Sequence, residues 1–140
     1  MMQKLLLFTL ISFFTVDVFA TTINFESLFR GQSITDDTAR NIFESQVLRS
    51  KIPVIMKIST PTCGPCIMTK KPYETLSKNY HNKVTFMEMD ATRFMRLSSQ
   101  LAVSRVPLFI YFYNGLEQKR FTGKDGLNEL ILYLQNQIKQ

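Results

Sequence analysis

Two cysteines three residues apart are the strongest chemical feature of this 140-residue sequence. Cys63 and Cys66 are its only cysteines, and they lie in the run Thr62-Cys63-Gly64-Pro65-Cys66. At this spacing on a helix, two sulfurs share one face and are close enough to close a small disulfide ring. Such a pair can carry out thiol–disulfide exchange, in which one thiolate attacks a disulfide and a second thiol displaces the mixed disulfide.

The segments on either side of the pair favour a reactive first cysteine. Residues 52–58 form an apolar, β-branched run of strand length, and residues 67–80 have the pattern of a helix. The first sulfur is therefore expected at a helix N-terminus, where unpaired N–H groups and the positive dipole end favour thiolate over thiol. Gly64 and Pro65 keep the turn compact, and proline is tolerated in the first turn of a helix.

Other uses of the two cysteines fit less well. A structural disulfide across two intervening residues constrains little chain, and two sulfurs are half of the ligands that a structural zinc site needs. His81 is the only histidine, and we expect it to be a solvated residue at a helix end rather than a ligand. Two small buried hydrophobic residues without a redox role are the remaining alternative. We therefore favour redox chemistry, with no metal and no cofactor.

Segment 54–66, together with Val106-Pro107, resembles the thioredoxin family, and the resemblance extends over roughly residues 31–138. It implies that Cys63 is the exposed attacking thiol, that Cys66 is the buried resolving thiol, and that the two form the redox-active disulfide. It also implies a cis peptide bond before Pro107. By the same resemblance, the residues expected to contact a substrate chain are Thr62, Gly64, Pro65, Val106 and Pro107.

Two positions depart from the family pattern. Thr62 stands where thioredoxins usually have a tryptophan beside the reactive sulfur. Lys57 stands where they have a buried aspartate that is thought to move protons for the second cysteine. If Lys57 is charged, it should stabilise the thiolate of Cys66 and make the protein more oxidising, whereas a neutral Lys57 could act as the base. Alternatively, Lys57 extends its amine to water and has no redox role.

The order of the expected elements predicts an α/β thioredoxin fold over residues 31–140. The helices are expected at 38–50 (capped by Asp36 and Asp37), 67–80, 93–102 and from Asp125 onward; the strands are expected at 52–58, 84–90, 108–113 and 118–122. Asn114-Gly115 is a strong hairpin signal between the last two strands. The order of these elements, βαβαβαββα when the extension at 21–30 is counted as a strand, implies a mixed central sheet with helices on both faces. The extension at 21–30 could form a short helix or a short strand.

The first twenty residues have the layout of a secretory signal peptide. Lys4 precedes an apolar run at 5–16, and Val18-Phe19-Ala20 offers small residues at the positions that a signal peptidase reads. The alternative is an uncleaved N-terminal anchor. Both interpretations place the domain outside the cytoplasm, as a periplasmic or secreted protein that the anchor would tether to the membrane.

Charge and composition limit the partners. The net charge is +6, but the basic residues are scattered and no run interleaves them with aromatic residues, so we expect no nucleic-acid binding. A solvated basic surface is favoured over a patch for an acidic partner.

Together these features predict a monomeric protein-disulfide reductase that acts on the disulfides of other proteins. Outside the cytoplasm such a reductant needs an electron donor, which we expect to be a membrane protein that the sequence does not identify. A disulfide oxidase or isomerase is the first alternative. The second is a non-catalytic module that uses the same fold to bind extended polypeptides.

Overall fold

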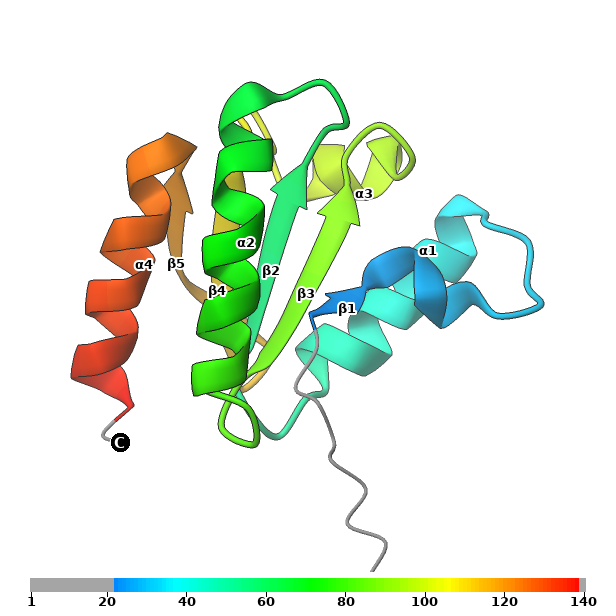
Figure 1. Cartoon of the computed structure of the whole chain (residues 1–140). Coiled ribbons are helices and arrows are strands. Elements are labelled where there is room, and N and C mark those ends of the chain that lie inside the picture. Colours follow the sequence, from blue (N-terminus) through cyan, green and yellow to red (C-terminus); the bar gives the residue numbers. More distant parts are fainter. Residues whose placement is uncertain (1–21, 139–140) are drawn as a thin grey trace, which may run out of the picture.

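Five strands form one mixed sheet in the order β1-β3-β2-β4-β5. The computed structural model describes residues 22–138, and Figure 1 shows the sheet with its flanking helices. β1 and β2 run parallel to β3, whereas β4 runs antiparallel to both β2 and β5. The bounds of the strands are β1 Ile23–Asn24, β2 Val54–Ser59, β3 Thr85–Asp90, β4 Leu108–Tyr113 and β5 Leu116–Thr122.

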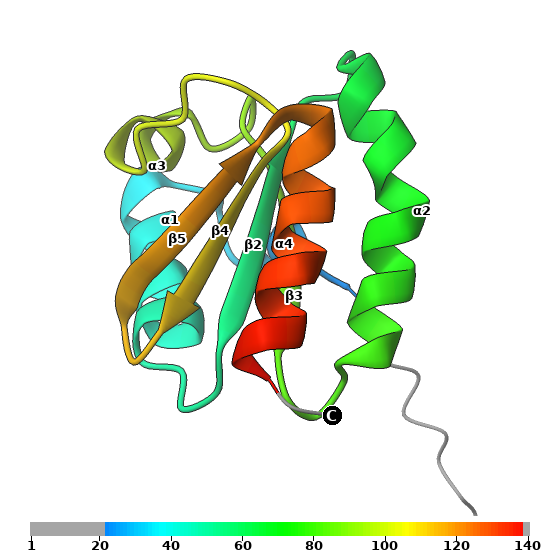
Figure 2. The same ribbon diagram turned by 90° about the vertical axis from the view of Figure 1, so that its left-hand side faces the viewer.

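Helices cover both faces of the sheet, as the element order predicted (Figure 2). On one face lie α2 (Gly64–Asn79) and α4 (Gly123–Gln137); on the other lie α1 (Asp36–Phe43) and α3 (Met95–Gln100). A π-helical segment, η2 (Glu44–Leu48), continues α1. Each face has its own hydrophobic core. Because β2 lies in the middle with both faces covered, residues 54–58 are buried without alternation.

The N-terminal extension contains both of the elements that the sequence left open. Ile23 of β1 pairs with Met87 of β3, and a 3₁₀ helix, η1 (Phe25–Phe29), follows directly. The ring centres of Phe25 and Phe29 lie 5.1 and 5.3 Å from the ring centre of Phe94, so the extension closes one end of a core. The proposed signal segment, 1–20, lies outside the described residues. Within 22–138 the helices are too short or too polar to cross a membrane.

Two predicted helix caps are wrong. The side chain of Thr35 accepts the N–H of Thr38 and caps α1, so Asp36 and Asp37 are the first helical residues rather than the cap. Asp125 likewise lies in the first turn of α4, which begins at Gly123. An acidic residue is stabilised by the helix dipole in the first turn as well as at the cap, and this explains the error of one or two residues.

The hairpin between β4 and β5 forms at the predicted position. Asn114 and Gly115 both have positive φ, at 52° and 76°, which is the requirement of a type I′ turn. Gly115 also lies directly against the backbone of η2: a Cβ atom at this position would be 2.5 Å from the carbonyl oxygen of Leu48.

Candidate active site

Cys63 caps the N-terminus of α2. Its backbone is extended, with φ −85° and ψ 108°, and the helix begins at Gly64. The Sγ atom of Cys63 accepts a hydrogen bond from the backbone N–H of Cys66 at 3.1 Å. Pro65 fits the first turn of α2, because N–H groups there have no partner within the helix and proline has no N–H group. A sulfur in this place is stabilised as a thiolate by the N–H groups and by the helix dipole.

Cys63 and Cys66 form a disulfide in this structure. Their Cα atoms are 5.2 Å apart, within the usual range for a disulfide. Cys63 is half-buried, whereas only 4% of Cys66 is exposed. A partner can therefore reach the first sulfur and not the second, which is the arrangement that the resemblance implied for an attacking and a resolving thiol.

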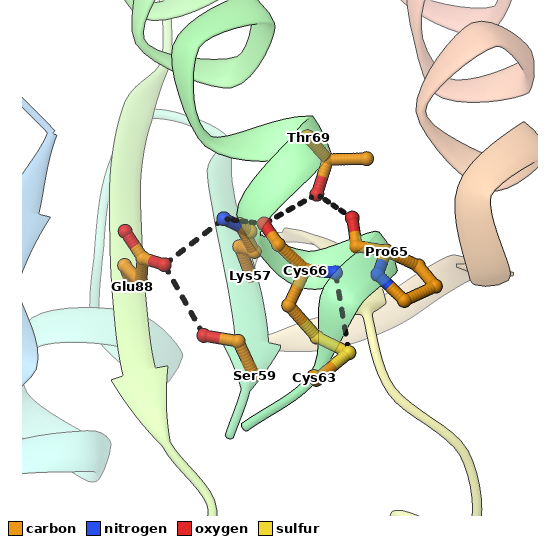
Figure 3. Close-up of a disulfide and its surroundings, with 7 residues drawn as sticks. All are labelled: Lys57, Ser59, Cys63, Pro65, Cys66, Thr69 and Glu88. Atoms are coloured by element: carbon orange, nitrogen blue, oxygen red, sulfur yellow. Dashed lines mark hydrogen bonds and ion pairs between the residues drawn. A yellow bond between two sulfur atoms is a disulfide. The ribbon is translucent and has the colours of Figure 1, made fainter. Parts of the chain in front are cut away.

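The backbone carbonyl of Cys66 is held by two side chains, as Figure 3 shows. The hydroxyl of Thr69 donates to it at 3.0 Å and lies 3.1 Å from the carbonyl oxygen of Pro65. The Nζ atom of Lys57 donates to the same carbonyl at 3.3 Å. These bonds fix the first turn of α2, and with it the position of the buried sulfur.

Lys57 is buried at the centre of the sheet and forms an ion pair. Its Nζ atom lies 2.9 Å from Oε1 of Glu88 and 5.7 Å from the centre of the Tyr73 ring, and only 1% of its side chain is exposed. The hypothesis that Lys57 extends to water is therefore wrong. Because β2 is the middle strand and α2 lies over it, the amine meets Glu88 before it can reach solvent.

Glu88 is the site residue that sequence analysis missed. It lies directly beside Lys57 in the parallel register of β2 and β3. Its Oε1 atom also accepts the hydroxyl of Ser59 at 3.1 Å, and 27% of its side chain is exposed. The available signal was a second charge, opposite in sign to the first, in the middle of another largely apolar strand.

A polar hollow of about 330 Å³ opens beside the buried sulfur. Cys66 and Glu88 both line it, so the second cysteine and the carboxylate border the same space. Its other walls come from α2, β3, the end of β2 and the N-terminal extension, and include Asn24, Glu26, Ser59 and Lys70. Among residues 22–138, no group of three or more His, Cys, Asp or Glu side chains is placed to hold a metal ion.

The ring of Tyr73 lies next to the Lys57–Glu88 ion pair. Its buried hydroxyl lies 3.0 and 2.9 Å from the carbonyl oxygens of Ile55 and Met87, where it can donate to either. Burial raises the pKa of Tyr73 well above its usual value, and the negative charge of Glu88 raises it further. Tyr73 is therefore a neutral hydrogen-bond donor that ties β2 and β3 together beneath Lys57.

The Val106–Pro107 peptide bond is cis, as the resemblance implied. Pro107 is buried, and its carbonyl accepts the N–H of Gly123 at 2.8 Å. The next residue, Leu108, begins β4 opposite Ile58 of β2. Pro107 therefore lies at the end of the sheet from which the Cys63 loop leaves β2.

The surface around Cys63 is open and partly apolar. Thr62, Gly64 and Pro65 are exposed. Ile67 and Met68, in the first turns of α2, are 64% and 61% exposed. No aromatic ring stands at position 62, so these two side chains supply apolar surface next to the disulfide. The substrate contacts expected at positions 62, 64, 65, 106 and 107 stay predictions.

Comparison with known proteins agrees with this geometry. The thioredoxin family model matches residues 33–136. A thioredoxin of Rickettsia bellii is 29% identical over 96 residues, which cover 69% of this chain and 91% of that protein. A thioredoxin of Rickettsia felis is 26% identical over 106 residues, covering 76% of this chain and 97% of that protein.

Solved structures show the same fold. The crystal structure of thioredoxin from Trypanosoma brucei brucei superposes with a TM-score of 0.69 at 20% identity, covering 89% of this chain and 97% of that one. A thioredoxin from Nicotiana alata gives a TM-score of 0.68 at 19% identity, covering 84% and 92%. The five-stranded mixed sheet with helices on both faces is thus the fold of these proteins.

Proposed function

Because the chain belongs to the thioredoxin family and is a thiol–disulfide oxidoreductase, we propose that it reduces the disulfides of other proteins outside the cytoplasm. The observation that carries this proposal is the position of the Cys63 sulfur at the N-cap of α2, bonded to the N–H of Cys66. An accessible sulfur with a helix N-terminus behind it is a good nucleophile. The buried Cys66 is placed to attack Cys63 in the second exchange.

The reaction proceeds in two exchanges. The thiolate of Cys63 attacks one sulfur of the partner's disulfide, the partner's S–S bond breaks, and its other sulfur leaves as a thiolate. Cys66 then attacks Cys63, the mixed disulfide breaks, and the partner's second thiolate is released. Two electrons pass to the partner, whose thiolates take protons from water, and the enzyme ends as the Cys63–Cys66 disulfide.

The Lys57–Glu88 pair supports the direction of reduction. A lone lysine beside Cys66 would stabilise the thiolate of the reduced form and make the protein a stronger oxidant. The carboxylate of Glu88, 2.9 Å from Nζ, offsets that charge. Lys57 is then a positioning residue that holds the Cys66 carbonyl. Glu88 and Cys66 border the same hollow, through which the proton that Cys66 loses before the second exchange can pass to water.

The location outside the cytoplasm rests on the sequence of residues 1–20. A reductant there must be re-reduced, since its surroundings oxidise thiols. A membrane-bound electron donor that breaks the Cys63–Cys66 disulfide supplies the two electrons for each cycle. The protein works as a monomer, because each chain carries a complete dithiol.

Insulin reduction with two cysteine variants tests the proposal. Cys63→Ser should abolish the reduction of insulin by protein that dithiothreitol keeps reduced. Cys66→Ser should accumulate a mixed disulfide with insulin, visible on a gel and lost when the gel sample is reduced. If both variants bound an extended polypeptide as tightly as the parent, and the parent left insulin oxidised, the protein would be a binding module and the proposed activity would be wrong.

A further inference from the structure

We propose that the end of the domain opposite Cys63 binds the surface of an anionic membrane. A hollow of about 500 Å³ lies at this end. The surface around it, called the basal face here, consists of Lys51, Ile52, Lys83, Tyr113 and Tyr133. The proposal concerns a second surface and does not depend on the redox direction proposed above.

The topology brings the basal face together from four segments. Val54 pairs with Thr85 on one side and with Phe112 on the other. The loop before β2, the turn before β3 and the turn after β4 therefore meet at one end of the sheet. The last turns of α4 end there too, and both views show the Cys63 loop at the other end of the molecule (Figures 1 and 2).

The charge of the basal face is positive. Lys51 and Lys83 are exposed, and none of the residues between 22 and 138 that line the hollow is acidic. The Nζ atom of Lys119 lies 5.2 Å from the centre of the Tyr133 ring and adds a third positive charge at the edge. Glu117, the acidic residue of β5, is bonded to Arg120 at 2.6 Å, so its charge is offset. Anionic lipids attract a cluster of this kind.

Apolar and aromatic groups accompany the lysines. Ile52 and Tyr113 are 42% and 44% exposed, and Leu116 at the adjacent hairpin is 65% exposed. Tyrosine is favoured at the interface between water and lipid, because its ring is apolar and its hydroxyl remains hydrated. Exposed apolar side chains beside the lysines fit a lipid interface better than they fit a purely ionic contact with a soluble acidic protein.

The chain also enters the domain from this end. The hydroxyl of Thr22 lies 3.4 Å from that of Ser77, in the last turns of α2. The preceding residues include the apolar run at 5–16, which the sequence identifies as a signal segment or an anchor. If this segment is retained in a membrane, the basal face is the part of the domain next to the lipid, and Cys63 faces away toward its partners.

Binding to vesicles tests the proposal, with residues 22–140 used so that the apolar segment cannot contribute. These residues contain the five-stranded sheet, both cores and all of the segment that the thioredoxin family model matches, residues 33–136, so this part folds on its own. Co-sedimentation should show binding to vesicles of phosphatidylcholine and phosphatidylglycerol in equal parts, no binding to phosphatidylcholine alone, and loss of binding in high salt.

Matched variants locate the binding surface. Lys51→Gln/Lys83→Gln should weaken vesicle binding about 25-fold, because each lysine near the lipid surface contributes a factor of about five. Lys71→Gln/Lys124→Gln removes the same charge from exposed residues outside the basal face and should bind like the parent. Ile52→Ser should weaken binding without changing charge.

Each of three results would overturn the proposal. They are equal losses of vesicle binding in the two double variants, no binding of the parent to the mixed vesicles, and binding to soluble heparin but not to vesicles. Circular dichroism of the same samples shows that the variants are folded. If the basal double variant is unfolded, Lys51→Gln alone decides, with a loss of about fivefold expected. Vesicle binding by a protein that fails to reduce insulin would refute the proposed reductase and leave the membrane surface standing.

Discussion

Replacing Glu88 by glutamine should leave a buried positive charge without its counter-charge. The Lys57 side chain is 1% exposed, and its Nζ atom bonds Glu88 and the carbonyl of Cys66. Removing one partner of a buried ion pair costs about 3–5 kcal/mol. Because Glu88 is 27% exposed and a glutamine oxygen can still accept from Lys57, we expect a smaller loss, about 2–3 kcal/mol in the free energy of unfolding.

The matched variants are Lys57→Met and the double substitution. Lys57→Met removes the buried charge and leaves a partly exposed carboxylate still bonded to Ser59, so its cost should be about 1–2 kcal/mol. With both charges removed, the double variant should be more stable than Glu88→Gln alone. Guanidinium unfolding of the oxidised protein, followed by circular dichroism because the chain has no tryptophan, measures all three. Costs that simply add would refute the coupling of the two charges.

The same series has a redox readout. In Glu88→Gln the charge of Lys57 is no longer offset, so the thiolate of reduced Cys66 is stabilised and the reduction potential should rise, by about 30 mV for each 1.4 kcal/mol. Lys57→Met should not raise it. An unchanged potential in Glu88→Gln would show that the carboxylate does not offset the charge next to Cys66.

Two further predictions concern stability. The pKa of Tyr73 is raised in the folded protein, so above about pH 10 the unfolded chain releases a proton that the folded protein keeps. The free energy of unfolding should therefore fall as the pH rises above that value. Tyr73→Phe should make this fall less steep, as measured by denaturant titrations at alkaline pH. Gly115→Ala combines positive φ with a contact to Leu48, whereas Gly31→Ala has similar φ and open space around it. The first should lose about 1 kcal/mol more than the second in thermal or denaturant unfolding, and equal losses would contradict the close contact.

The position of the dithiol could be predicted because its determinants are local. The apolar run before Cys63 forms β2, and the helix begins where Pro65 fits a first turn. The hairpin at Asn114 and Gly115 was predictable for the same reason, since both residues tolerate positive φ. In each case a few adjacent residues decide the structure.

The partner of Lys57 could not be predicted in this way. Glu88 is 31 residues further along the chain, and the two meet only through the register of two parallel strands. A shift of one residue would turn Glu88 to the other face of the sheet. The sequence contains both charges but not the register, and so the hypothesis of a solvated Lys57 stayed open until the structure excluded it.

The N-terminal extension illustrates a second limit. Asn24 caps η1 locally by accepting the N–H of Glu26, but the place of Phe25 and Phe29 is fixed by contact with Phe94 on a distant segment. Propensity over so short a segment is weak, and tertiary packing decides the outcome.

The reduction potential of the Cys63–Cys66 pair, equilibrated against glutathione, tests the proposed reductase most directly. If Glu88 offsets Lys57 and the protein is a reductant, the potential should be about −250 mV or lower. A value of about −120 to −180 mV would make the protein an oxidant or an isomerase, and the proposed direction of electron flow would be wrong.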